Sequence, residues 1–169
     1  MYQRILVPVD GSATADLGLD EAIRLAKLTG ARLRLVHVVD GVTFATGLEL
    51  ATGDILGLLV DAGAQILTAA RARVEASGVA VDTFLPEAGS GRACDVVIAQ
   101  AKLWNADLIV IGTHGRRGVG RLFIGSDAEQ IVRTAPVPVL LVRPEAAKAG
   151  AAAVGLGEAA ASRADALAA

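Results

Sequence analysis

Two stretches of the chain contain apolar, often β-branched residues at successive positions, RILVPV at 4–9 and DLIVIG at 107–112. Neighbouring side chains of a strand point to opposite faces of the sheet, so a strand with this pattern is expected to be buried on both faces. Such strands are typical of parallel sheets that helices cover on both sides. These two stretches therefore predict an α/β protein.

The rest of the chain supplies the other elements of such a fold. Three further stretches with strand character lie at 32–39, 79–86 and 137–143. Apolar residues recur at helical spacing in four places: after Ser12, from Ile55 to near Gly78, from Ser90 to Trp104, and from Ser126 until before Pro136. The stretch 40–53 shows neither period and is predicted to be a loop. The order of elements predicts a three-layer sandwich, with a five-stranded parallel sheet and helices on both faces.

Two helix starts carry residues that suit an N-terminus. Ser12 is expected to cap the first helix, and Gly30 is expected to end it. Ser126 is expected to cap the last helix, whose first turn carries Asp127 and Glu129. Both carboxylates suit the positive end of the helix dipole.

One domain is expected from residue 1 to 144. Residues 145–169 form an alanine-rich stretch with few large apolar side chains. A helix without an apolar stripe has little to pack against, so this stretch is expected to be a flexible tail.

The charge balance excludes some classes of partner. Sixteen basic and 18 acidic residues give a net charge of -2, so we expect no nucleic-acid or membrane partner, and any anion site must be local. No apolar stretch is long enough to span a bilayer, and no secretion signal is visible. Cys94 is the only cysteine, which excludes an internal disulfide. These features together predict a cytoplasmic protein.

A glycine-rich segment, GTHGRRGVGRLFIGSDAE at 112–129, directly follows one of the buried strands. Glycine lets backbone N–H groups approach a ligand closely, and arginine supplies positive charge, so the segment suits a phosphate group. A plain surface loop is the alternative reading.

Polar or glycine residues gather at three predicted strand ends: Asp10 and Gly11, Val38 to Gly41, and the segment from Gly112. In an open parallel sheet, ligands bind at the carboxyl ends of strands. A carboxylate accepts hydrogen bonds from a nucleoside, an apolar strand end covers a base, and glycine amides bind phosphate. The three strand ends therefore indicate a nucleotide pocket.

The glycine-rich segment carries a spaced pattern: Gly112, two residues, Gly115, nine residues, then Gly125 and Ser126. With ILVPVDGS near the beginning and PVPVLLVR near residue 140, this pattern resembles the universal stress proteins over about residues 1–144. The resemblance implies a flavodoxin-like, Rossmann-like fold with strand order 3-2-1-4-5. It also implies a stress-response regulator that binds ATP and forms a homodimer.

In that family the nucleoside is contacted by an aspartate after the first strand and a valine after the second, which correspond to Asp10 and Val38. The glycines and the serine of the spaced pattern would hold ribose and phosphates, with Mg²⁺ accompanying the phosphates. The full predicted site is Pro8, Val9, Asp10, Val38, Gly112, Thr113, His114, Gly115, Arg116, Gly125, Ser126 and Asp127. The last strand, Pro138 to Arg143, is the expected dimer edge.

Several alternatives stay open at this level. Asp10 also suits a turn or helix cap, His114 suits a turn, and Arg116 suits a solvated basic surface. His37 is expected to be a hydrogen-bonded core histidine. The carboxylate of Asp127 would repel a triphosphate unless it points away or faces magnesium, so AMP or ADP is an alternative to ATP.

No catalytic residue is predicted. The sequence contains neither a GxxxxGK[ST] phosphate loop nor a GxSxG nucleophile motif. The expectation is a binding protein, at most with slow ATP hydrolysis or autophosphorylation. An interaction module that binds no nucleotide is the competing reading.

Overall fold

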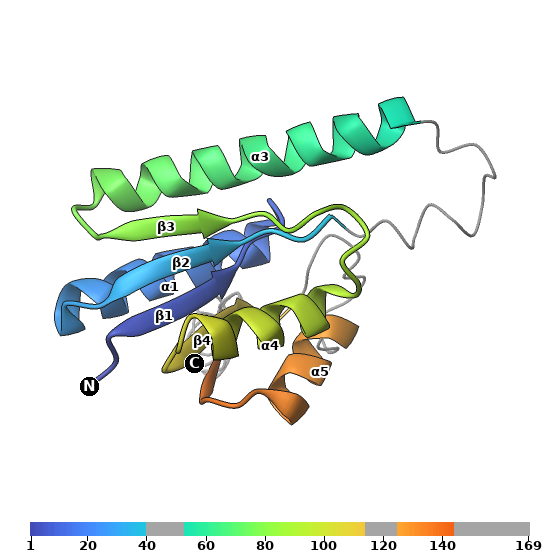
Figure 1. Cartoon of the computed structure of the whole chain (residues 1–169). Helices are drawn as coiled ribbons and strands as arrows, with labels where there is room; N and C mark the ends of the chain where they lie inside the picture. Colours follow the sequence, from blue (N-terminus) through green and yellow to red (C-terminus); the bar gives the residue numbers. More distant parts are fainter. Residues whose placement is uncertain (40–52, 114–124, 144–169) are drawn as a thin grey trace, which may run out of the picture.

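The computed structural model describes residues 1–39, 53–113 and 125–143. Its centre is a five-stranded sheet of order β3-β2-β1-β4-β5, in which every neighbouring pair is parallel (Figure 1). The strands are β1 (Arg4–Pro8), β2 (Arg32–Val36), β3 (Val81–Phe84), β4 (Leu108–Gly112) and β5 (Val139–Val142). The predicted fold class is confirmed, including the order 3-2-1-4-5.

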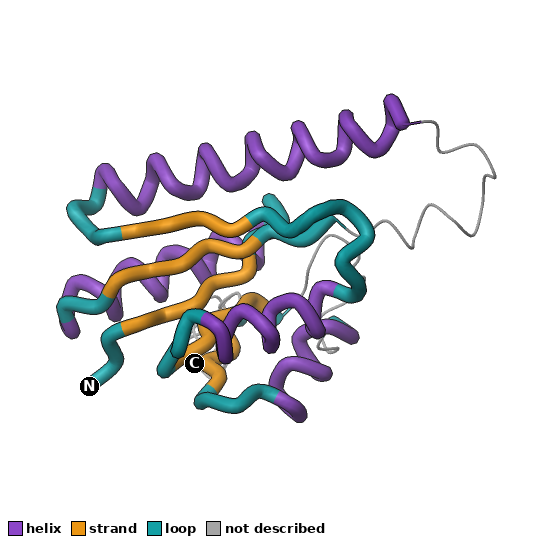
Figure 2. Tube along the Cα trace, in the orientation of Figure 1, coloured by secondary structure: helices purple, strands orange, loops and turns teal. Residues whose placement is uncertain are grey.

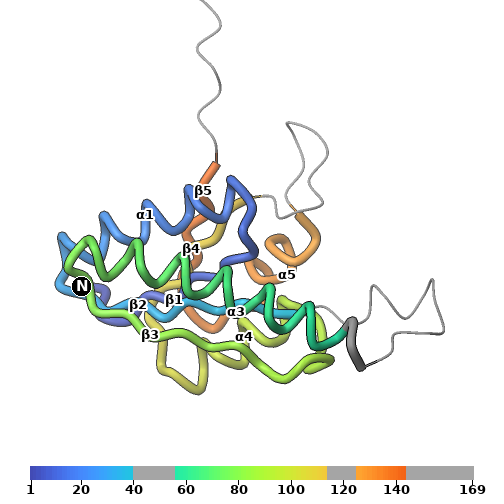
Figure 3. The backbone as a smooth tube through the Cα atoms, turned by 90° about the horizontal axis from the view of Figure 1, so that it is seen from above, coloured from blue at the N-terminus to red at the C-terminus, as the bar shows by residue number. Residues whose placement is uncertain are grey.

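Helices cover both faces of this sheet (Figures 2 and 3). They are α1 (Ala13–Thr29), α3 (Gly53–Ala76), α4 (Ala93–Leu103) and α5 (Ser126–Thr134). Buried residues of α1 and α3 belong to one hydrophobic cluster, and those of α4 and α5 belong to a second. The described part of the chain is therefore a three-layer α/β sandwich.

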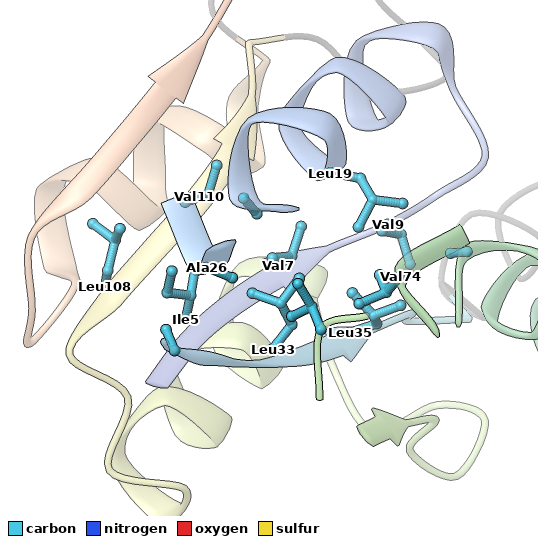
Figure 4. Close-up of a cluster of buried hydrophobic side chains, with 14 of the residues drawn as sticks. Ile5, Val7, Val9, Leu19, Ala26, Leu33, Leu35, Val74, Leu108 and Val110 are labelled. Carbon is cyan, nitrogen blue, oxygen red and sulfur yellow. The ribbon is translucent and has the colours of Figure 1, made fainter. Parts of the chain in front are cut away.

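The alternation of side chains along β1 separates the two clusters. Ile5 and Val7 point into the cluster with α1 and α3, where Leu33 and Leu35 of β2 join them (Figure 4). Leu6 belongs to the opposite cluster, with α4 and α5. These side chains are all fully buried, and each such side chain stabilises the fold by about 1.5–3 kcal/mol.

The ends of α1 agree with the expectation. Ser12 is the N-cap, and its Oγ accepts a hydrogen bond from the N–H of Ala15 at 3.2 Å. Gly30 ends the helix in the left-handed conformation, with φ of 72°, which glycine adopts without steric cost.

Other predicted ends were wrong. The helix expected from Ser90 begins at Ala93, because Gly89 and Gly91 adopt positive φ values that are incompatible with a helix. Ser126 does not cap the last helix: Gly125 is the N-cap and Ser126 is the first helical residue. The second strand ends at Val36, where its pairing with β1 also ends, and not at residue 39.

Two predictions fall outside the described residues. The expected loop over 40–53 lies there except for Gly53, which is the first residue of α3. The expected tail over 145–169 also lies there, so the domain boundary at 144 stays a prediction. Among the described helices, none combines the length and hydropathy that crossing a bilayer requires.

Candidate functional site

The candidate site lies at the carboxyl edge of the sheet, where β1 and β4 are neighbours. The helix after β1 is α1 and the helix after β4 is α5, and these two helices cover opposite faces. Between such strands the following helices diverge and leave a crevice, which is the usual place of a ligand in a doubly wound sheet. The carboxyl ends of β1, β2 and β4, after which the sequence places its polar and glycine residues, all lie at this edge.

Asp10 stands in the turn between β1 and α1. Its Oδ1 accepts a hydrogen bond from the backbone N–H of Ser12 at 2.9 Å, so the predicted turn role is present. Pro8 is the last residue of β1, and Val9 is buried, with its N–H donating to the Val36 carbonyl at 2.9 Å. These bonds attach the turn to β2 on one side and to the cap of α1 on the other.

The next strand end carries His37 and Val38. The His37 side chain is buried, and its Nδ1 lies 2.7 Å from the carbonyl oxygen of Val9, which confirms a hydrogen-bonded core histidine. Val38 is partly buried and packs with the α4 and α5 cluster. It therefore lies on the opposite face of the sheet from His37.

Gly112 ends β4 and touches the backbone at the start of α1. A β-carbon at this position would contact the Thr14 carbonyl oxygen and stand 2.6 Å from the Thr14 carbonyl carbon and 3.0 Å from the Ala15 nitrogen. Contacts below 3.0 Å essentially never occur for real β-carbons. Close packing of helix against strand therefore requires glycine here, whether or not a ligand binds.

The two described ends of the glycine-rich segment meet. The N–H of Gly125 donates to the Thr113 carbonyl at 2.8 Å, and the N–H of Thr113 donates to Val142 of β5 at 3.0 Å. The Thr113 side chain is buried. The bond between Gly125 and Thr113 holds the start of α5 at the end of β4, close to the turn of Asp10. His114, Gly115 and Arg116 lie outside the described residues.

The N-terminus of α5 has no side-chain cap among the described residues, because its N-cap is Gly125. The first N–H groups of any α-helix have no partner within the helix, and together with the helix dipole they favour an anion. Glu129 donates its N–H to the Gly125 carbonyl at 2.9 Å as the first helical bond. The backbone at Ser126 and Asp127 thus has the geometry that suits a phosphate.

The side chain of Asp127 contacts residues of the neighbouring helix α4. Its Oδ1 lies 3.7 Å from Nη2 of Arg92, the N-cap residue of α4, and its negative charge is one of the causes that raise the pKa of the Cys94 thiol. The α4 and α5 helices pack side by side (Figure 2). Arg92 therefore partly balances the negative charge that was expected to repel a triphosphate.

Cys94 is a packing residue of α4. Its side chain is fully buried, and this burial raises the pKa of the thiol above its ordinary value of 9.0. The carboxylates of Asp127 and Asp95 raise the pKa further, while Arg92 acts in the opposite direction. A buried thiol with a raised pKa stays protonated and unreactive at neutral pH.

Sequence reasoning overlooked Arg92 and Thr14. A signal for Arg92 was present but unused: Arg92 follows the GSG stretch at 89–91, which contains glycine and comes after β3, at the carboxyl edge of the sheet. Thr14 carried no signal, because it acts through its backbone carbonyl against Gly112.

The doubly wound sheet, with this edge at its switch point, defines an α/β domain of the kind that binds ligands between diverging helices. Residues 1–143 match the universal stress protein family, and the chain belongs to that family. It is similar to a universal stress protein of Methanocaldococcus jannaschii, with 31% identity over 144 residues that cover 85% of this chain and 83% of the relative. The resemblance stated from the sequence is confirmed.

Solved structures of family members share the fold. A universal stress protein family member from Burkholderia pseudomallei is 32% identical, with a TM-score of 0.66, and the match covers 83% of this chain and 96% of that one. The structure of a universal stress protein from Archaeoglobus fulgidus in complex with dAMP is 26% identical, with a TM-score of 0.60. That match covers 83% of this chain and 97% of the other.

Proposed function

We propose that this protein binds an adenine nucleotide at the carboxyl edge between β1 and β4 and acts as a nucleotide-dependent regulator in the cytoplasmic stress response. The observation that carries the proposal is the bond between Gly125 and Thr113, which brings the N-terminus of α5 next to the strand end that adjoins the Asp10 turn. A carboxylate for the nucleoside and a helix N-terminus for the phosphates then lie at one edge. The dAMP complex of the Archaeoglobus protein supports an adenine ligand.

In this proposal the predicted site residues have different roles. Asp10 accepts hydrogen bonds from the nucleoside, since an ionised carboxylate acts only as an acceptor and offers two oxygens. Val38 covers the base, and the backbone N–H groups of Ser126 and Asp127 bind phosphate. Gly112 acts indirectly, because it lets α1 approach the end of β4. His114, Gly115 and Arg116 complete the phosphate site in the proposal.

Magnesium has little protein support in the described part of the chain. No group of three or more histidine, cysteine, aspartate or glutamate side chains gathers among those residues in a way that would hold a metal ion. In the proposal, Mg²⁺ therefore enters with the phosphates of ATP or ADP, and the protein's own contribution is the helix N-terminus. We propose binding without efficient turnover.

A calorimetric titration with AMP, ADP and ATP, each with and without Mg²⁺, tests the proposal. We expect the wild type to bind, and Asp10→Ala to weaken binding at least tenfold, which is about 1.4 kcal/mol. Asp61→Ala is the matched control, because it removes an exposed carboxylate on α3 and should change affinity less than twofold. No binding under any condition would instead favour an interaction module without nucleotide.

The charge of Asp127 should select between nucleotides. Asp127→Asn removes a negative charge beside the phosphate position and releases Arg92 from its ion pair. We expect ATP affinity to rise about three- to tenfold, because one repulsive unit charge near a partly solvent-exposed phosphate is removed. AMP affinity should rise less, because AMP carries less negative charge. Glu129→Gln is the control, since that carboxylate pairs with Arg133 further along α5 at 3.7 Å. An unchanged ratio of ATP to AMP affinity in Asp127→Asn would show that its charge does not reach the phosphates.

We also propose a homodimer through the edge strand β5, within Pro138 to Arg143. This strand pairs with β4 alone in the described sheet, and its four residues are apolar and half-buried. An unpaired edge offers backbone groups for pairing with a second copy across a two-fold axis. Light scattering should give twice the mass of the 17.1 kDa chain, and a monomer at high protein concentration would contradict this proposal.

A further inference from the structure

His37 links three strands from the end of β2. Its backbone N–H donates to the Phe84 carbonyl of β3 at 3.2 Å, and its Nδ1 lies 2.7 Å from the Val9 carbonyl oxygen beyond β1. A carbonyl oxygen only accepts hydrogen bonds, so Nδ1 carries the proton and donates it. Nδ1 of His37 therefore donates to the Val9 carbonyl in place of a backbone N–H, just beyond the last regular β1–β2 residue pair.

The bond matters because of the residue that receives it. The β1–β2 register ends with Pro8 opposite Val36, and one further backbone bond runs from the Val9 N–H to Val36. The imidazole then binds the Val9 carbonyl, whose peptide unit leads directly into Asp10. Asp10 in turn accepts the N–H of Ser12. One hydrogen bond and one peptide unit thus connect His37 with Asp10, whose carboxylate lies at the proposed nucleoside end of the site.

The other side of the ring packs against α3. A β-carbon on Gly63 would stand 2.6 Å from Cδ2 of His37 and 3.0 Å from its Nε2. Both His37 and Gly63 are buried. The position of the ring is therefore set by α3 on one side and by the Val9 carbonyl on the other, with little room to move between them.

The geometry points to His37 as a positioning residue that fixes Asp10 for the nucleoside and makes its placement depend on α3. This inference rests on the proposed nucleotide site, and it adds a residue that acts on the ligand only through the turn of Val9 and Asp10. His37 itself faces α3 and not the α4 and α5 side, where Val38 lies.

Two substitutions separate the effect of the hydrogen bond from the effect of the ring's volume. In His37→Asn the side-chain nitrogen takes the place of Nδ1 and can still donate to Val9. His37→Leu fills a similar volume but has no donor. If His37→Leu fails to fold, His37→Gln replaces it, since the Gln nitrogen lies at the level of Nε2 and not of Nδ1.

Two measurements are made on each full-length variant: the AMP dissociation constant, and the hydrogen exchange rate of the Ser12 amide without nucleotide. We expect the variant without the donor to bind AMP at least fivefold more weakly and to exchange at Ser12 at least tenfold faster. His37→Asn should stay within twofold of the wild type in both.

The inference is overturned if the variant without the Nδ1 donor keeps the wild-type exchange rate at Ser12. It is also overturned if His37→Asn loses as much AMP affinity and as much protection from exchange at Ser12 as that variant. The exchange measurement needs no ligand. If the wild type bound no AMP, the proposed function would fail, while exchange at Ser12 would still decide whether His37 positions the turn.

Discussion

Gly112→Ala is expected to lower the free energy of unfolding by about 3 kcal/mol, the upper end of the usual cost of overpacking. The new β-carbon would meet the carbonyl group of Thr14 and the nitrogen of Ala15, all of them backbone atoms at the start of α1. Backbone cannot rotate aside as the end of a side chain can, so α1 must move away from β4. Urea denaturation followed by circular dichroism measures the loss.

The control for Gly112→Ala is a second glycine-to-alanine substitution, at a position where a β-carbon has no close neighbours. Gly57 lies in α3, and a β-carbon there would meet nothing within 4 Å. Gly57→Ala should therefore stabilise the protein by about 0.5–1 kcal/mol, because alanine favours helix over glycine. Equal stability of Gly112→Ala and wild type would refute the close packing of α1 on β4.

This prediction also bears on the glycine pattern of the family resemblance. Gly112 was assigned to the nucleotide because it opens that pattern, yet its contacts require glycine for packing alone. Loss of nucleotide binding in Gly112→Ala would thus be a consequence of a displaced α1. A variant that stays fully stable and loses only binding would restore the direct role.

Gly63→Ala has the second-largest expected effect, a loss of about 1–2 kcal/mol. The β-carbon would collide with the imidazole of His37 and approach Leu85 Cδ1 at 3.4 Å. Overpacking of this kind costs about 1–3 kcal/mol, and the helix preference of alanine offsets up to about 1 kcal/mol of it. The measurement is the midpoint and slope of urea unfolding.

Gly57→Ala is again the matched control, since both glycines lie in α3 and differ in their surroundings. The two variants should shift the unfolding midpoint in opposite directions. If both raised it, the ring of His37 would have room to move, and its contact with α3 would not hold it in place.

Much of the fold could be predicted from the sequence because its signals are local. The doubly apolar β4, the cap at Ser12 and the left-handed Gly30 each depend on a few neighbouring residues. Errors at helix starts had equally local causes. At Ser90 the flanking glycines outweighed the serine, and at Ser126 the helix began one residue earlier than its expected cap implied.

The candidate site was predictable as a place but only partly as a set of contacts. Strand ends of a parallel sheet meet at one edge whatever their side chains are, so Asp10, Val38 and Gly112 were correctly placed at that edge. The sequence could not show that Asp127 turns toward Arg92, because these residues are far apart in the chain and belong to different helices.

The sequence by itself determined the elements, their order and the edge where function is expected, because periodicity and capping act over a few residues. Only the tertiary structure decided that Gly112 is required by the backbone of Thr14, and that His37 holds the carbonyl before Asp10. These contacts join elements distant in the chain. Which residues make these contacts depends on how helices pack against strands, and a local pattern of residues does not determine that packing.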